Sequence, residues 1–466
     1  MKLPYYTTSA QGGPSPQQIA SWARALLRLH ERLAPYFARR EPRQHALLYL
    51  QAVVSEIPRK NSWQIAEQAR QLRPYGIQRL LSRAVWDHEG VRDELRSFVH
   101  QTLTPSPLLP EHAEHEAPFP VLVLDESGFP KRGCHSAGVQ VQYCGATGRV
   151  ENCQVGVFLS YVTASGHALI DRDLYLPEEW CHDLPRRLAA HIPETLTFQT
   201  KPELAKLMVE RAQAAGLPID WVVADTVYGH CPDLRMWLEE QGYAYALAVP
   251  CTEVVCVQTQ AGCLLADVAS IVHQLRAKDW QRLSQSQGTK GERLFDWAIL
   301  PWVQGGTPDG RHFLVFRRCL DDPRELAYYL VFAPPATPLS TIVQAIGARW
   351  AIEEDLQATK DLGLDQYEVR SYLGCYRHLT LVMLAYAFLV QICVQENAPP
   401  GPQISPTALP APALIPLTPS EVRHLLARLF FPAPTSAPLI CQWSWWRRGH
   451  QYWAGYYHRR RRQKAG

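Results

Sequence analysis

The chain has 466 residues, enough for two or three domains with a sizeable core. Hydrophobic residues make up 47% and charged residues 20%, which excludes a disordered chain. The net charge is only +3, but residues 1–100 hold 15 Lys/Arg against 8 Asp/Glu, and residues 443–466 hold 7 Lys/Arg and no acid. The segment between them is therefore acidic. Two basic ends around an acidic centre predict ends that contact a polyanion and a centre suited to cations.

No segment of the sequence predicts a membrane protein. The N-terminus lacks the apolar stretch of a signal peptide, and the longest apolar run, 379–394, falls short of the roughly 20 residues that span a bilayer. We expect this run to be a buried core helix. The 12 cysteines include no CxxC pair and no zinc-site spacing, so they predict reduced thiols. Together these features indicate a soluble, cytoplasmic protein.

The first hundred residues predict a helical domain. Apolar residues recur at helical spacing through IASWARALLRLHERLAPYF, PRQHALLYLQAVVSEI, SWQIAEQAR and YGIQRLLSRAVW. Short helices with arginine on their exposed faces are typical of a helical DNA-binding module. An ordinary helical bundle explains the same pattern equally well.

After a Pro- and acid-rich stretch, the pattern changes to strands alternating with helices. FPVLVLDESGFP predicts an apolar strand ending at Asp125, followed by two more strands in VQVQYCG and ENCQVGVFLSYVT. A helix over 201–216 ends at Gly216, and IDWVVADTVYG predicts a second buried strand ending at Asp225. Residues 251–335 appear β-rich, and a helix starts at Thr341.

This order of elements predicts a mixed α/β fold with a ribonuclease H-like catalytic domain, interrupted by a β-rich insertion and preceded by a helical domain. The predicted parts are a helical DNA-binding domain (1–105), the first part of the catalytic domain (106–250), the insertion (251–337), the last catalytic helices (338–397), a Pro-rich linker (398–417), and a short helix with a basic aromatic tail (418–466).

Three acids are candidates for one site. Asp125 and Asp225 each follow a buried strand, so they should project at the same carboxyl edge of the sheet, and Glu353 lies on a helix able to pack across it. Either aspartate alone could simply cap a turn. As a set, they are the oxygen ligands that Mg²⁺ prefers, and two such ions can activate a water or a 3′-hydroxyl and stabilise the leaving oxygen. The substrate would then be a phosphodiester.

The segment RWAIEEDLQATK, residues 349–360, separates its three acids by helix geometry. Arg349, Glu353 and Lys360 fall at about 0°, 40° and 20° around a helix axis, whereas Glu354 and Asp355 fall at about 140° and 240°. A carboxylate between two bases suits a metal-bound phosphate. The alternative is a plain i,i+4 ion pair of about 0.2–0.5 kcal/mol between Arg349 and Glu353. Glu354 and Asp355 are expected to be solvated or structural.

The segments VLDESGFPKRG, GRVENCQVGVFLSYV, ALIDRDLYLPEEW, TKPELA, WVVADTVYG and RWAIEEDLQATKDLGLDQYEVRSYLGCYRHLTL occur in this order over about residues 40–390. In them the chain resembles DDE transposases of bacterial insertion sequences, and more narrowly the insertion-sequence seven-zero-one type, a relative of the insertion-sequence-four branch. The resemblance implies a ribonuclease H-like fold, catalytic and metal-binding roles for Asp125, Asp225 and Glu353, and DNA strand cleavage and strand transfer that depend on two Mg²⁺ ions, with Mn²⁺ able to substitute.

The related branch carries a Tyr–Arg–Glu–Lys signature on its last catalytic helix. Arg349, Glu353 and Lys360 match its offsets, but Ile346 stands at the tyrosine position, so the function of that tyrosine is absent or supplied elsewhere. The resemblance also implies DNA as partner, both as element ends and as target. It further implies a dimer on DNA, because two ends must be cut together, and a nucleoid-associated bacterial protein.

Several cations are candidates for DNA contact. The predicted DNA-binding residues are Arg349, Lys360, Lys131, Arg447, Arg448, Arg459 and Arg460, with Arg132, Arg370, Arg377 and His378 as weaker candidates. The tail aromatics Trp443, Trp445, Trp446, Tyr452 and Trp453 could stack on bases or pin the tail to the rest of the protein.

Three other functions remain open from the sequence. A ribonuclease H-like nuclease without strand transfer would need the same acids. A non-catalytic DNA-binding relic of a transposase is less compatible with an intact set of three. Paired carboxylates for glycoside hydrolysis would explain the acids, but neither the basic ends nor the Arg/Lys stripe.

Overall fold

The computed structural model describes residues 13–104, 119–259, 262–288, 291–303, 308–397, 415–434 and 436–465. The chain forms two compact units: one of residues 1–94, 358–369 and 373–466, the other of residues 95–357 and 370–372. Their boundaries fall inside α5 (His88–Leu103) and α13 (Arg349–Asp361). Most of the predicted Pro-rich linker, residues 398–414, lies outside the described residues.

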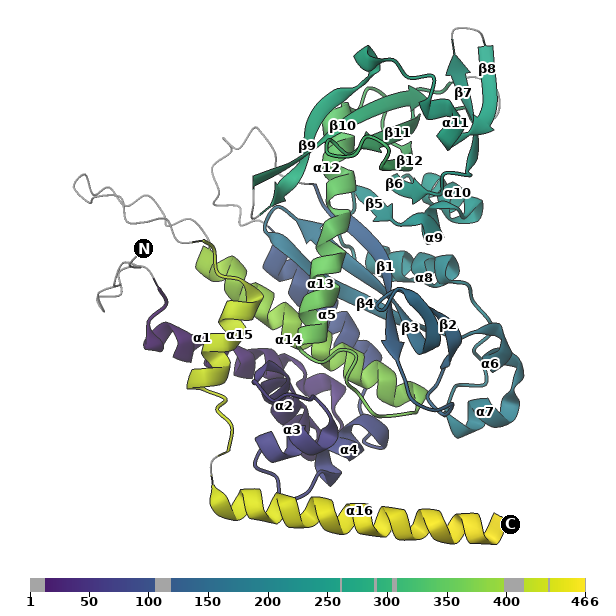
Figure 1. Cartoon of the computed structure of the whole chain (residues 1–466). Helices are drawn as coiled ribbons and strands as arrows, with labels where there is room; N and C mark the ends of the chain where they lie inside the picture. The colour runs from purple at the N-terminus through teal and green to yellow at the C-terminus, as the bar shows by residue number, and fades with distance from the viewer. Residues whose placement is uncertain are drawn as a thin grey trace, which may run out of the picture. The chain divides into compact units, whose positions relative to one another are not determined.

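The first unit is helical (Figure 1). Polar caps begin two of its helices: Ser15 forms a capping box on α1, and Thr418 accepts a hydrogen bond from the Glu421 backbone N–H at the start of α15. The helices are α1 (Pro16–Arg32), η1 (Ala34–Tyr36), α2 (Arg40–Val54), α3 (Ser62–Gln68), α4 (Tyr75–Ser82), the first turns of α5, α14 (Tyr372–Asn397), α15 (Pro419–Leu429) and α16 (Ala437–Ala465).

Helix α14 contains the long apolar run of the sequence. By length and composition it could cross a membrane, but 83% of its most apolar window is buried. Its buried His378 is hydrogen-bonded through both ring nitrogens: the Tyr49 hydroxyl of α2 lies 2.6 Å from Nδ1, and the other nitrogen lies 3.0 Å from the Gly363 carbonyl oxygen. The prediction of a buried core helix is confirmed.

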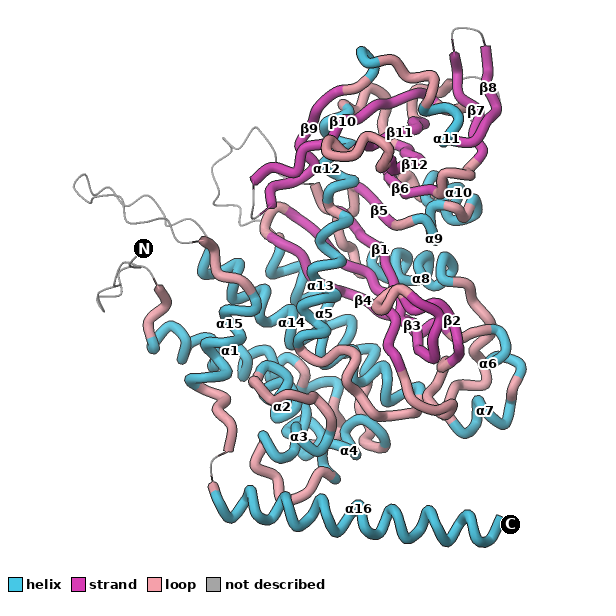
Figure 2. Tube along the Cα trace, in the orientation of Figure 1, coloured by secondary structure: helices cyan, strands magenta, loops and turns pink. Residues whose placement is uncertain are grey.

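The second unit is built on one large mixed sheet (Figure 2). Its strand order is β2-β3-β1-β5-β6-β12-β11-β10-β9, with β4 also paired to β3. Strands β1, β5 and β6 are parallel to one another, and the remaining pairings are antiparallel. The strands are β1 (Val121–Pro130), β2 (Gln140–Cys144), β3 (Arg149–Thr163), β4 (Gly166–Tyr175), β5 (Trp221–Ala224), β6 (Ala244–Val249), β9 (Gln281–Gly288), β10 (Gly291–Pro301), β11 (His312–Arg318) and β12 (Leu326–Phe332); β7 (Val254–Thr259) and β8 (Gly262–Asp267) form a separate hairpin.

The helices of this unit are mostly short. They are α6 (Glu178–His182), α7 (Leu184–Ala189), α8 (Lys201–Ala214), α9 (Thr226–Gly229), α10 (Pro232–Glu240), α11 (Val268–Val272), η2 (Ala277–Asp279), α12 (Leu339–Gly347) and the first turns of α13. Helix α8 packs on β3 and β4, and α12 packs on β5, β6 and β9. The predicted mixed α/β fold is confirmed.

The structure differs from the sequence prediction at three points. Strand β4, which forms a hairpin with β3, was not predicted. The β-rich stretch after residue 250 contributes β9 to β12 to the main sheet, because β12 pairs with β6, and its core is also built around Val257, Trp302 and Leu330. The basic tail, for which no secondary structure was predicted, is part of the 29-residue helix α16.

Candidate catalytic site

The two predicted aspartates lie side by side. Strands β1 and β5 are parallel, and their last paired residues are Leu124 and Ala224, so Asp125 and Asp225 follow at the same level. The four residues before each aspartate are buried, which fixes both strands in the core. Asp125, however, does not end its strand. β1 continues to Pro130 because its other edge stays paired with β3.

The electrostatics of this pair are those of crowded acids. Burial raises the pKa of Asp125 to about 7, and the charge of Asp225 adds to the effect. Burial likewise raises the pKa of Asp225 to about 6, with a further contribution from Glu126. Among the described residues, the carboxylates of Asp125, Glu126 and Asp225 offer ligand oxygens that all lie within 4.8 Å of one another. Such a cluster fits a hard divalent cation, whose charge would relieve the repulsion.

Local structure fixes the direction of Asp225. Its side chain caps α9 by accepting a hydrogen bond of 3.0 Å from the Val227 backbone N–H. Helix α9 packs directly on β6, where a Cβ atom at Gly229 would lie 1.9 Å from the Ala248 carbonyl oxygen. Only glycine permits that approach. Asp225 therefore both caps α9 and belongs to the acidic cluster.

Arg349 connects Glu353 to the acidic cluster. One guanidinium nitrogen, Nη2, donates to Glu353 Oε1 one turn along α13, and the other, Nη1, lies 4.0 Å from Asp125 Oδ2. Glu353 is not itself part of the group of mutually close oxygens. Arg349 thus lies between two of the three predicted acids, and its pair with Glu353 is the i,i+4 ion pair that helical spacing allows.

The other two acids of α13 point elsewhere. Asp355 is fully buried and lies 2.6 Å from His167 Nδ1, and it also accepts a hydrogen bond from Ser160. Glu354 is half-exposed and lies 3.4 Å from the other ring nitrogen of His167. The prediction that these two are solvated or structural is confirmed, with Asp355 the structural one.

The sequence interpretation missed Glu126. Its neighbour Asp125 was singled out as the end of a strand, and residues that follow each other in a strand normally face opposite sides of the sheet. The only local signal was the doubled acid in LDES. In the structure Glu126 Oε1 lies 2.5 Å from Lys201 Nζ, and Glu126 Oε2 accepts a hydrogen bond of 3.1 Å from the Tyr228 hydroxyl.

The predicted DNA-binding cations lie in three places. Arg349 is in the site. Lys131 directly follows β1, and Lys360 lies in the last turn of α13. The remaining four are on α16, where Arg448, Arg459 and Arg460 are exposed, and Arg447 forms an ion pair of 2.6 Å with Glu67 of α3.

Two of the weaker candidates are structural. Arg377 is buried, and its guanidinium donates to four backbone carbonyls, those of Leu80, Leu81, Ala84 and Trp86. His378 is fully buried beside Tyr49. A role of either residue in DNA contact is therefore wrong. Arg370 and Arg132 remain exposed.

The tail aromatics divide between the two roles that the sequence left open. Trp443 is fully buried and donates to the Gln71 carbonyl, and Trp446 packs edge-on against Trp63, so these two pin α16 to the helical unit. Trp445 and Tyr452 are exposed, with 72% and 62% of their surface open to solvent. Those two, together with Trp453, stay available for a partner.

Comparison with known proteins agrees with this geometry. The model of a family described as "DDE superfamily endonuclease" matches residues 32–263, which include both aspartates. Over these residues the chain is similar to DDE superfamily endonucleases. A relative, described as a probable transposase for insertion sequence element IS701 of Microchaete diplosiphon, is 22% identical over 321 residues, covering 68% of this chain and 75% of the relative. These matches confirm the resemblance that the sequence motifs indicated.

The similarity to this family gives the acidic cluster a context. In a DDE endonuclease, acidic side chains at the carboxyl edge of a sheet are the expected place for metal-dependent chemistry on a phosphodiester. The stretch that carries Glu353 lies beyond the residues that the family model matches. Its assignment to the site rests on the contact with Arg349.

Proposed function

We propose that this DDE endonuclease is a DNA transposase. It would cut the ends of an insertion sequence by phosphodiester hydrolysis and join the freed 3′-hydroxyls to target DNA by transesterification, on a ribonuclease H-like catalytic domain. The observation that carries the proposal is the placement of Asp125 and Asp225 on adjacent parallel strands, with Glu353 tied to Asp125 through Arg349. The relative described as a probable transposase supports the same activity.

The chain's own residues fit a divalent metal. Asp125 and Asp225 would hold it, with Glu353 as the third ligand. Burial, together with the neighbouring acids, raises the pKa of both aspartates, and a bound cation would offset that cost. When bound, Mg²⁺ or Mn²⁺, most simply as a pair of ions, supplies a Lewis acid for the phosphate oxygens and lowers the pKa of a bound water. Glu126 is less available as a ligand because both its oxygens are already engaged.

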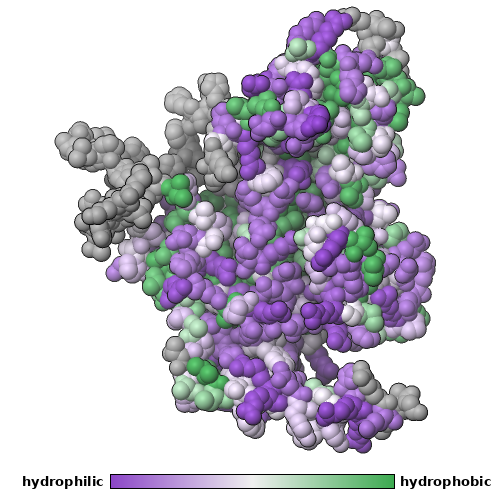
Figure 3. All heavy atoms as spheres, viewed as in Figure 1, coloured by the Kyte–Doolittle hydropathy of each residue, from purple (hydrophilic) through white to green (hydrophobic). Residues whose placement is uncertain are grey.

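The protein's cations would orient the DNA. Arg349, beside Asp125 and Glu353, is placed to contact the phosphate at the cleavage site, and Lys360 continues its stripe along α13. Helix α16 would bind the DNA backbone, since its exposed arginines are accompanied by no acid. In the view of Figure 3 the surface of α16 is hydrophilic to intermediate along most of its length. The N-terminal helices would recognise the element end.

Pairing of two element ends requires two copies of the chain, so we propose a dimer on DNA in the bacterial nucleoid. The test uses purified protein, a duplex carrying an inverted repeat that flanks the gene, and Mg²⁺. We expect strand cleavage at the repeat and joined products with pre-cut ends, both lost in Asp125→Asn. Cleavage without joined products would instead identify a nuclease. Identical products from the variant and the wild type would refute catalysis at this cluster.

A further inference from the structure

Lys201, in the segment TKPELA, is a cation at the edge of the acidic cluster that the function proposed above does not use. Its ammonium lies 2.5 Å from Glu126 Oε1, while the Tyr228 hydroxyl donates to the other oxygen of the same carboxylate. Tyr228 is fully buried, which keeps its pKa well above the ordinary value and its hydroxyl protonated. Glu126 is thus held on one side by a neutral donor and on the other by a charge.

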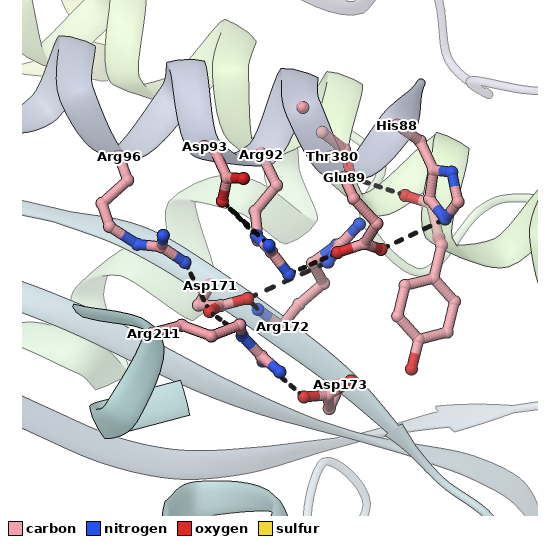
Figure 4. A network of polar contacts seen from close by, with 12 residues as sticks. His88, Glu89, Arg92, Asp93, Arg96, Asp171, Arg172, Asp173, Arg211 and Thr380 are labelled. Atoms are coloured by element: carbon pink, nitrogen blue, oxygen red, sulfur yellow. Dashed lines mark hydrogen bonds and ion pairs between the residues drawn. The ribbon is translucent and has the colours of Figure 1, made fainter. Parts of the chain in front are cut away.

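Contacts near both ends of α8 fix the position of Lys201, which lies in its first turn. At the first turn, Thr200 and Glu203 form a reciprocal capping box around it, with Glu203 Oε2 accepting from the Thr200 backbone N–H at 2.7 Å. Further along, Arg211 donates to Asp171 at 2.8 Å and to Asp173 at 2.6 Å, both on β4 (Figure 4). Arg96 of α5 donates to the same Asp171, so the network fixes α8 on the sheet.

The charges around the cluster favour a phosphate contact by a protein cation in addition to Arg349. Four carboxylates, those of Asp125, Glu126, Asp225 and Glu353, are connected by the contacts described above, and the cations in direct contact with them are Arg349 and Lys201. Arg349 contacts Asp125 and Glu353, whereas Lys201 contacts Glu126. A phosphodiester approaching this cluster is repelled unless cations meet its oxygens, and lysine is a common point-charge ligand for phosphate. Lys201 keeps 23% of its side chain exposed, enough to be reached.

We propose that Lys201 is a phosphate-binding residue of the cleavage site, and that Glu126 stores its ammonium beside the cluster until DNA arrives. The proposal rests on the DNA-cleaving function proposed above. Its rival is a purely structural ion pair that fastens α8 to β1. The two explanations predict different effects on DNA affinity when each residue is replaced separately. If Lys201 binds phosphate, its replacement weakens DNA binding, whereas replacement of Glu126 does not. If the ion pair is only structural, replacing either residue breaks the same pair and has the same effect.

The test compares Lys201→Gln, Lys201→Arg and Glu126→Gln in the full-length protein. Binding of a duplex carrying the element end is measured against salt concentration in Ca²⁺, a hard oxygen-binding cation, so that affinity is read without relying on turnover. We expect Lys201→Gln to weaken binding about 5- to 10-fold and to reduce the salt slope by about 0.9, the amount for one phosphate contact. Lys201→Arg should restore most of both, and Glu126→Gln should bind as tightly as wild type or more tightly.

Thermal unfolding of each variant checks that it folds. A wild-type salt slope in folded Lys201→Gln would overturn the proposal, as would equal losses of DNA affinity in Lys201→Gln and Glu126→Gln. Failure of the underlying function is a separate result, because it would appear as cleavage by Asp125→Asn. An inactive Asp125→Asn together with an unchanged slope in Lys201→Gln rejects the role of Lys201 alone.

Discussion

The proposed chemistry of the site depends on individual carboxylates whose ionisation is opposed by their surroundings. Asp125 is held among buried residues of β1, and its pKa of about 7 means that near neutral pH it is only partly ionised. Burial is the main cause, and the charge of Asp225 is the second. Such a residue destabilises the fold when it is charged and becomes favourable only when a cation shares the site.

Asp125→Asn is therefore expected to stabilise the metal-free protein. The folded pKa of Asp125 lies above its ordinary value of 3.8, so its ionisation disfavours the folded state increasingly as pH rises from about 4 through 7. We expect the variant to gain on the order of 2 kcal/mol at pH 8, a figure reduced for the partial exposure of the side chain, and nothing at pH 4. Calorimetry at both pH values measures the difference in stability between the variant and the wild type. In the same experiment at pH 8, Mg²⁺ should raise the Tm of the wild type but not that of the variant. A variant less stable than wild type at pH 8 would contradict the crowding argument.

Glu353 and Glu354 provide a matched pair of acids one residue apart. Glu353 shares Arg349 with Asp125, whereas Glu354 faces His167. We expect Glu353→Gln to lower the rate of DNA cleavage by about 10²–10³-fold, as loss of one charge-stabilising group does, and Glu354→Gln to lower it less than about 3-fold. Single-turnover cleavage of a duplex with the element end gives both rates. The reverse order would refute the register of α13.

At the scale of elements, the structure fastens α13 to the sheet through Asp355. This carboxylate is fully buried and holds His167 at the start of β4 and Ser160 on β3. Burial lowers the pKa of His167, but Asp355 and Glu354 outweigh it, and the net effect raises this pKa to about 10. The imidazolium–carboxylate pair therefore fixes the helix that presents Arg349 and Glu353.

The stability contributed by His167 should depend on pH. Because its folded pKa is above the ordinary 6.5, the contribution is complete below pH 6.5 and is lost as pH rises through about 10. We expect His167→Gln to cost about 2 kcal/mol at pH 6 and clearly less at pH 10, measured as the difference in unfolding free energy from wild type. Arg324→Gln, in an exposed pair with Asp322, is the control and should show no such trend. A cost that is constant from pH 6 to 10 would show that His167 is held neutral.

Features of the structure that depend on neighbouring residues could be predicted from the sequence, whereas features that depend on distant residues could not. The sequence predicted the strands before Asp125 and Asp225 because runs of apolar residues encode them directly. It predicted α13 because the spacing of its residues is helical. The continuation of β1 past Asp125 was not, since it depends on pairing with β3. Glu126 was missed for the same reason, because its role comes from Lys201 and Tyr228, far away in the chain. Likewise, the strands beyond β6 looked like an insertion until their pairing with the sheet was seen.

At the scale of the whole molecule, the uneven charge of the sequence corresponds to separate structural parts. The acids proposed for catalysis lie in the sheet unit, whereas the basic residues near the end of the chain lie on one continuous helix, α16. Its first half is fixed to the helical unit by Trp443 and by the ion pair of Arg447 with Glu67. Its second half has exposed arginines, such as Arg459 and Arg460, and exposed aromatic rings.

This division predicts a loss of DNA affinity without a loss of catalytic chemistry when the far half of α16 is neutralised. For Arg459→Ala/Arg460→Ala, we expect the slope of log affinity against log salt to fall by about 1.8, the amount for two phosphate contacts. The loss of affinity should be the same on specific and random duplexes, because contacts to the DNA backbone carry no sequence information. Arg282→Ala/Arg324→Ala removes two exposed arginines from the sheet unit, each paired with an acid, and controls for net charge. Filter binding over a range of salt concentrations measures both variants. If the two double variants change the slope equally, overall charge and not α16 is responsible for DNA affinity. An effect confined to the α16 variant identifies this helix as a DNA-binding arm of the protein.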